Sequence, residues 1–128
     1  MNEPRELIVV KLGGTTLAEE HETLAGVAEA SRRQGIVVVH GGGRRLTEWI
    51  ARLGLETRFE DGRRVTDDAA LEVALAVLGG VVNAELVAAL QALDVPAAGL
   101  TGIDGGLLLA DRVPRLGRVA RVVGARPA

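Results

Sequence analysis

Two runs of glycine each follow a stretch of β-branched residues, and a lysine precedes the first run closely. The first run is Lys11-Leu12-Gly13-Gly14, and the second is His40-Gly41-Gly42-Gly43. Glycine lets a backbone approach a ligand closely, and consecutive N–H groups in a turn can converge on an anion. Lys11 would add a positive charge beside such an anion. The pattern predicts a phosphoryl-transfer site built from two strand-end turns, with phosphate contacts from Gly13, Gly14 and Gly41.

Each of these features also has a simpler interpretation. Either glycine run alone could be an ordinary tight turn between a strand and a helix. Lys11 could be a strand-end lysine whose ammonium reaches solvent. Two glycine runs at equivalent places favour the phosphoryl-transfer site. Lys11 also favours it, because an unpaired ammonium inside an apolar strand would be costly and so needs an anion nearby. Neither run matches the P-loop or the dinucleotide-binding fingerprint.

Two further side chains could contact a substrate. Arg64 lies on a predicted hairpin and could hold a carboxylate by two parallel hydrogen bonds, although a solvated hairpin arginine is the commoner case. The neighbouring Arg63 makes this assignment harder. Asn83 follows Gly79-Gly80 in a helical pattern and could reach the same crevice, while a helix-surface asparagine is the alternative.

The remaining polar candidates are weaker. His40 could act as a base, but a histidine at a strand end is more often structural. His21 is expected to be a solvated helix residue. Asp104 precedes Gly105-Gly106 and is interpreted as a turn residue. The sequence contains no metal-ligand cluster or hydrolase triad.

The elements that must position these residues alternate between strands and helices. Glycines end the first two helices, and Asp61-Gly62 between short extended runs is a strong hairpin signal. Thr66 or Asp67 can cap the third helix, and a kink or break is expected at Gly79-Gly80. The predicted strands are Leu7–Leu12, Ile36–Val39 and Val95–Leu100. The predicted helices include Ala18–Gln34 and Arg44–Leu53. A closing ribbon is expected from Leu107–Ala110 and Arg118–Val123.

This alternation predicts an α/β fold with an open, mainly parallel sheet sandwiched by helices. Ligands in such sheets bind outside the carboxyl ends of the strands. Because both glycine runs lie at those ends, we expect them to line one crevice.

Composition narrows the function classes. The 128 residues fit one domain, and 48% of them are apolar. The net charge of −2 offers no basic field for nucleic acid or an anionic membrane, and the scarcity of aromatic residues disfavours base stacking. The absence of cysteine excludes thiolate chemistry and fits a cytoplasmic enzyme. No targeting segment is expected, and the apolar stretch 69–93 is interpreted as a soluble buried helix.

Several motifs, in order and at similar spacing, resemble the acetylglutamate kinases of the amino acid kinase family. The matching segments are Lys11–Gly14, His40–Gly43, Gly62–Asp67, Leu71–Val73, Val82–Val87 and Gly99–Gly106. The resemblance implies the amino acid kinase fold and ATP-dependent phosphorylation of the γ-carboxylate of N-acetyl-L-glutamate. It implies that Lys11 stabilises the transferred phosphoryl group and that Gly13, Gly14, Gly42 and Gly43 give N–H donors. Arg64 and Asn83 would bind the substrate.

The resemblance covers essentially the whole chain, 1–128, but only about the first half of the family pattern. Residues 1–128 would form the N-terminal acetylglutamate-binding lobe, and the half that holds most of the ATP and Mg²⁺ site is expected elsewhere. Turnover by the chain alone is therefore an open question. Ile103 stands where lysine is common, and Arg44-Arg45 stand where proline is common. The lack of an extra N-terminal helix implies a homodimer without arginine feedback.

Three alternatives stay open. A related kinase acts on carrier-protein-linked aminoadipate or glutamate, although the hairpin around Asp61-Gly62 fits the acetylglutamate pattern better. The chain could instead be a non-catalytic module that binds an acidic ligand. It could also be a non-functional fragment with an exposed sheet edge.

Overall fold

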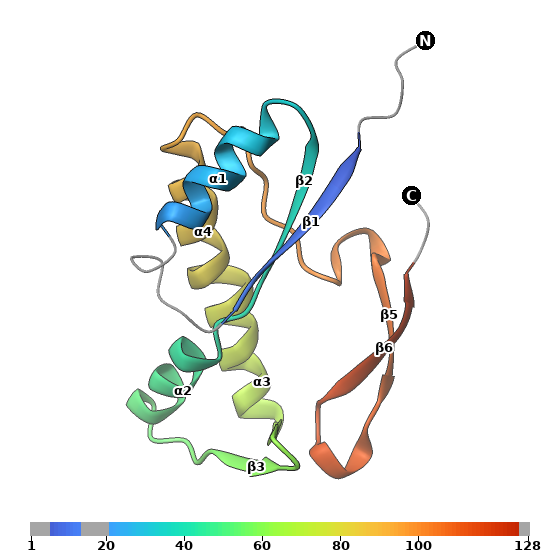
Figure 1. Ribbon diagram of the computed structural model, residues 1–128. Coiled ribbons are helices and arrows are strands. Elements are labelled where there is room, and N and C mark those ends of the chain that lie inside the picture. The colour runs from blue at the N-terminus through green and yellow to red at the C-terminus, as the bar shows by residue number, and fades with distance from the viewer. Residues whose placement is uncertain (1–5, 14–20, 126–128) are drawn as a thin grey trace.

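The computed structural model describes residues 6–13 and 21–125 (Figure 1). Strands β1 (Leu7–Leu12) and β2 (Gly35–His40) pair in parallel, with Leu12 opposite His40. Helix α1 (His21–Ser31) connects the two strands. Both predicted strands and the pairing of their carboxyl ends are confirmed, so the two glycine runs begin at the same edge of the sheet.

One face of this parallel pair packs against helices. Val10, Leu12 and Val38 join a core cluster with Leu24 and Val27 of α1 and with two leucines of α4 (Asn83–Gln91). Side chains alternate between the faces of a strand, and the opposite face carries exposed residues. They are Leu7, Val9, Lys11, Val37 and Val39, with Val9 64% exposed. The α/β class with a parallel sheet is confirmed, while among the described residues α1 and α4 cover one face.

The predicted second helix is observed as α2 (Gly43–Arg52). Its apolar residues Leu46 and Ile50 are buried against Ala70 and Val77, which form a second core cluster with them. The spacing of Leu46, Trp49 and Ile50 places them on one side of the helix, which explains this packing.

The third helix begins where the sequence predicts but does not break at its glycines. Asp67 caps α3 (Asp68–Ala74), because its carboxylate accepts a hydrogen bond from the Ala70 N–H at 2.8 Å. Helical structure continues through η1 (Leu75–Val82), a π-helical segment that contains Gly79-Gly80, and into α4. The expected break is therefore wrong, since a widened helix accommodates the two glycines.

Residues 68–91 are long and apolar enough, by length and composition alone, to cross a membrane. In this fold the helix uses Val77 to contact α2, and Leu86 and Leu90 to contact α1 and the sheet. Most of its other side chains are at least partly exposed. The helix is thus a packing element with an apolar outer side.

The hairpin prediction is confirmed. Strands β3 (Arg58–Glu60) and β4 (Arg63–Val65) pair antiparallel around Asp61 and Gly62. Both turn residues have positive φ, 49° and 74°, which is the backbone that a type I′ turn requires.

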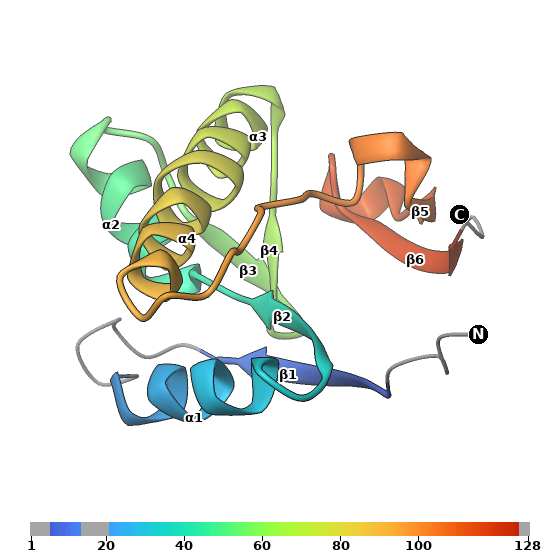
Figure 2. The same cartoon turned by 90° about the horizontal axis from the view of Figure 1, so that it is seen from above.

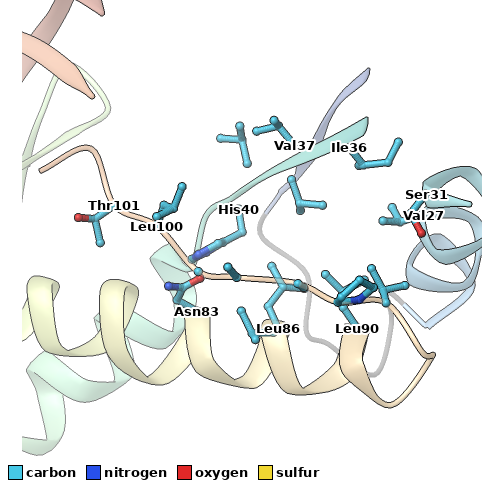
Figure 3. Close-up of a pocket in the computed structure, with 18 of the residues that line it drawn as sticks. Val27, Ser31, Ile36, Val37, His40, Asn83, Leu86, Leu90, Leu100 and Thr101 are labelled. Atoms are coloured by element: carbon cyan, nitrogen blue, oxygen red, sulfur yellow. The ribbon is translucent and has the colours of Figure 1, made fainter. Parts of the chain in front are cut away.

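Val95–Leu100 does not form the predicted third strand. Pro96 has no N–H to donate, and the Ala97 N–H donates to the Val95 carbonyl at 2.8 Å. Because these backbone groups bond locally, the described residues show no ladder between this segment and β2. The segment runs extended between β2 and α4 (Figures 1 and 3).

The closing ribbon is confirmed with slightly shifted bounds. It consists of η2 (Asp104–Gly106), β5 (Leu108–Arg112), η3 (Pro114–Leu116) and β6 (Ala120–Ala125), with β5 antiparallel to β6. Figure 2 shows the ribbon to one side of the helices. A bridge between Thr66 and Gly117 joins it to the base of the hairpin.

Candidate functional site

The second glycine run, Gly41–Gly43, is named the glycine turn. Its first residue continues the sheet, because the Gly41 N–H donates to the Leu12 carbonyl at 3.1 Å. The Gly41 amide thus already has a backbone partner, and its predicted phosphate contact stays a prediction. Gly13 is exposed at the end of β1, and the predicted phosphate ligand Gly14 lies outside the described residues.

Gly42 is the residue that requires glycine in this turn. Its φ of 146° is unfavourable for residues with a side chain, and a Cβ there would lie 2.7 Å from Leu78 Cδ2. Its carbonyl accepts the first hydrogen bond of α2, from Leu46 N–H at 2.9 Å. No side chain in the described part of the chain caps this helix start. The amides of the first turn and the positive end of the helix dipole can therefore meet an anion.

Arg64 is connected to the glycine turn through Thr47 of α2. The Arg64 Nη2 donates to Thr47 Oγ1 at 2.7 Å, and that hydroxyl donates to the Gly43 carbonyl at 2.8 Å. A second donation from Arg64 Nη1 reaches Thr57 Oγ1 at 3.0 Å, and the guanidinium carbon lies 4.9 Å from the Phe59 ring centroid. These contacts hold the guanidinium beside the start of α2. Among the described residues they use two of its five N–H donors.

Lys11 is placed differently from the expectation. It lies on the open face of β1, opposite Val39, and its side chain is exposed. The argument that a buried ammonium needs an anion is therefore wrong for this structure. Its position, one residue before the end of β1, still brings it to the edge where the glycine runs begin.

His40 and Asn83 share a cavity of about 540 Å³ between β2, α4 and the extended segment 95–102 (Figure 3). Most of the lining is aliphatic. His40 Nδ1 lies 2.9 Å from the Gly41 carbonyl oxygen, which supports the structural role expected for this histidine. A side chain at Gly99 would overlap Asn83, so the extended segment packs directly on that amide.

The structure therefore forms two groups of the predicted residues. Gly42, Gly43 and Arg64 gather at the start of α2, whereas His40 and Asn83 face the cavity. The two groups meet where Gly42 packs on Val82, the neighbour of Asn83. No contact in residues 6–13 and 21–125 connects Lys11 with Arg64.

Two interactions of the site were not found from the sequence. Thr47 carries the contact between Arg64 and Gly43, and its spacing of one helical turn from Gly43 was the available signal. Arg45 and Glu85 form a bidentate ion pair with N–O distances of 3.1 and 3.0 Å. Glu85 raises the pKa of Arg45 by its hydrogen bonds and charge. The two partners are 40 residues apart, so no local pattern could reveal them.

Other charged groups near the site are structural. Asp104 accepts hydrogen bonds from the Thr101 N–H and hydroxyl at 2.6 and 2.9 Å, and the bond from the N–H is the main reason that its pKa is lowered. This supports its interpretation as a turn residue. Within the described ranges, no three His, Cys, Asp or Glu side chains are grouped to hold a metal ion. These residues alone do not fit a Mg²⁺ site.

Comparison with solved structures concerns the fold. A chain described as smu.665 from Streptococcus mutans superposes with a TM-score of 0.77 and 21% identity, covering 94% of this chain and 51% of that one. The N-acetylglutamate synthase from Neisseria gonorrhoeae, solved with coenzyme A and N-acetyl-glutamate, gives a TM-score of 0.71 at 22% identity, covering 94% of this chain and 29% of that one.

Sequence comparison gives nearer relatives. An acetylglutamate kinase from Rubrobacter xylanophilus is 50% identical over 117 residues, covering 91% of this chain and 46% of the relative. An acetylglutamate kinase from Solibacter usitatus is 43% identical, covering 94% of this chain and 49% of the relative. The chain thus spans about half the length of the curated relatives it matches. The pattern of the amino acid kinase family matches residues 6–126, and the chain belongs to that family.

Proposed function

We propose that this chain is the substrate-binding part of an acetylglutamate kinase, which phosphorylates the γ-carboxylate of N-acetyl-L-glutamate with ATP. The observation that carries the proposal is the hydrogen-bonded path from Arg64 through Thr47 to Gly43, which holds a cation beside the glycine turn. The relatives at 43% and 50% identity support this branch of the family.

Arg64 is proposed to bind the α-carboxylate of the substrate. Its guanidinium is already oriented by Thr47 and Thr57, so little side-chain entropy is lost when a carboxylate binds. The remaining N–H donors can form a two-pronged contact, which is stronger than a hydrogen bond between neutral groups. Asn83, next to Val82, is proposed to contribute an amide from the cavity side.

The phosphoryl group is proposed to lie at the carboxyl ends of β1 and β2. ATP, when bound, supplies this group, and the γ-carboxylate accepts it as ADP leaves. Backbone amides of Gly42 and Gly43, with the positive end of α2, would stabilise the charge on its oxygens. Gly13 and Gly14 are proposed as further donors, and Lys11 as the cation that approaches from the open face.

Most of the ATP site and the Mg²⁺ ligands are proposed to come from the other half of the family pattern. We further propose a cytoplasmic homodimer that binds neither nucleic acid nor membrane. The net charge of −2 disfavours nucleic acid and an anionic membrane as partners, and the absence of cysteine fits the cytoplasm.

Calorimetry with three ligands tests the proposal. The chain is titrated with N-acetyl-L-glutamate, with N-acetyl-L-aspartate and with free L-glutamate, after circular dichroism has shown that it is folded. We expect saturable binding of the first ligand, at least tenfold tighter than either of the others. A folded chain that binds none of them, or all three equally, would refute the assignment. Acylphosphate formation from ATP then distinguishes a complete enzyme from a binding module.

A further inference from the structure

The ion pair between Arg45 and Glu85 connects the helix that starts at the glycine turn to the helix that starts at Asn83. Arg45 lies in the first turn of α2, and Glu85 lies in the first turn of α4. Both side chains are only partly buried, at 39% and 40% exposure. Both guanidinium nitrogens of the fork are used, each donating to a different carboxylate oxygen. Such a pair fixes orientation as well as distance.

The other contacts of the glycine turn go mainly to β1 and to α2 itself: the Gly41 N–H donates to the Leu12 carbonyl, and the Gly43 carbonyl accepts from Thr47. Gly42 packs against Leu78 and Val82 of η1, but it has no side chain to lock the turn. No described side chain caps the start of α2. The turn also contacts both groups of site residues. The Gly43 carbonyl accepts a hydrogen bond from Thr47, which in turn contacts Arg64, and Gly42 packs on Val82, next to Asn83.

We propose that Arg45 and Glu85 are positioning residues that hold the glycine turn against α4 and thereby set the distance between the Arg64 group and Asn83. This inference rests on the proposed function for its effect on N-acetyl-L-glutamate binding. The pair is proposed to touch neither substrate nor phosphate. It acts through the backbone of the first turn of α2.

Hydrogen exchange tests, without any ligand, whether the ion pair holds the glycine turn in place. The reporter is the Leu46 N–H, which donates to the Gly42 carbonyl at 2.9 Å. We expect Arg45→Met and Glu85→Gln each to raise its exchange rate severalfold, because local opening of the turn becomes easier. The matched control is Arg44→Met, which removes the same charge from the exposed neighbouring residue. Exchange that stays at the control value in both variants would overturn the proposal.

Calorimetry tests whether the ion pair affects the binding of N-acetyl-L-glutamate. We expect the affinity for N-acetyl-L-glutamate to fall about fivefold in Arg45→Met and Glu85→Gln, within the range found for residues that act indirectly. The charge-reversed double variant, Arg45→Glu with Glu85→Arg, should recover both the exchange rate and the affinity, which a general loss of stability would not do.

The possible failures are distinguishable. If the parent chain binds N-acetyl-L-glutamate but the variants bind it equally well, the positioning role is wrong and the proposed function stands. If the parent chain does not bind it, the proposed function fails, and the Leu46 exchange rate still decides whether the pair holds the turn.

Discussion

Replacing Gly42 with alanine should destabilise the fold substantially. The residue sits at φ 146° and ψ 21°, outside the regions that L-residues with a Cβ ordinarily occupy. Backbone strain of this kind costs about 1–3 kcal/mol. The new Cβ would also lie 2.7 Å from Leu78 Cδ2 and 3.4 Å from Val82 Cγ2. Because the closer atom ends a flexible side chain, its displacement should cost about 1 kcal/mol.

The expected loss for Gly42→Ala is therefore about 2–4 kcal/mol of unfolding free energy. This is a large share of the roughly 5–15 kcal/mol that stabilises a typical domain. The matched control is Gly43→Ala in the same turn. A Cβ there meets nothing within 4 Å, and its φ is not in the positive region. Alanine at a helix position is up to about 1 kcal/mol better than glycine, so this variant should be neutral or stabilised.

Urea denaturation followed by far-ultraviolet circular dichroism measures both variants against the parent chain. The reasoning is refuted if Gly42→Ala unfolds at the same urea concentration as Gly43→Ala. A change in the slope of unfolding free energy against urea would instead show that the substitution altered the compactness of the denatured or native state, or that unfolding was no longer two-state.

Three further predictions concern the elements around the site. Asp67→Ala removes the cap of α3 and should cost about 1 kcal/mol in thermal or urea unfolding. Gly117→Ala places a Cβ against the Thr66 carbonyl oxygen at φ 75°. Strain and the clash together should cost about 2–4 kcal/mol and separate the ribbon from the hairpin. Asp104, whose folded pKa is lowered by hydrogen bonds from Thr101, should contribute stability above its unfolded pKa of about 3.9. That contribution should disappear as the pH falls through the lowered value.

Each of these has a clear contrary result. Asp67→Asn should retain most of the cap, so a loss equal to that of the alanine variant would contradict the capping role. Unchanged stability in Gly117→Ala would argue against the close contact with Thr66. A carboxyl titration of Asp104 by NMR with a midpoint at or above its ordinary value would contradict the hydrogen-bonded turn.

Local patterns in the sequence were enough to predict the first two strands, α2 and the hairpin. Their signals lie within a few residues, such as the β-branched run before His40 and Asp61-Gly62 between extended segments. Val95–Leu100 holds one β-branched residue and a proline, so its strand signal is weaker. The Ala97 N–H bonds locally, to the Val95 carbonyl, rather than to a neighbouring strand. The helix through Gly79-Gly80 continued because neighbouring packing outweighed the low helix propensity of glycine.

Part of the candidate site was also predictable from local sequence patterns. Glycine runs at strand ends and Arg64 on the hairpin can be found by residue type and spacing. Lys11 could not be assigned to a face, because alternation along β1 does not say which side the helices cover. The pairing of Arg45 with Glu85 depends on how α2 and α4 are placed together, which no local pattern encodes.

The most direct test of the account is N-acetyl-L-glutamate binding by Arg64→Ala compared with Arg63→Ala, measured by calorimetry. The two arginines are neighbours on β4, so both variants lose the same charge from the same strand. Loss of a bidentate contact to a carboxylate costs about 1.5–3 kcal/mol, or roughly tenfold to a hundredfold in affinity. We expect that loss for Arg64→Ala and a near-parental affinity for Arg63→Ala. Equal affinities in the two variants would contradict the assignment of Arg64 to the substrate carboxylate.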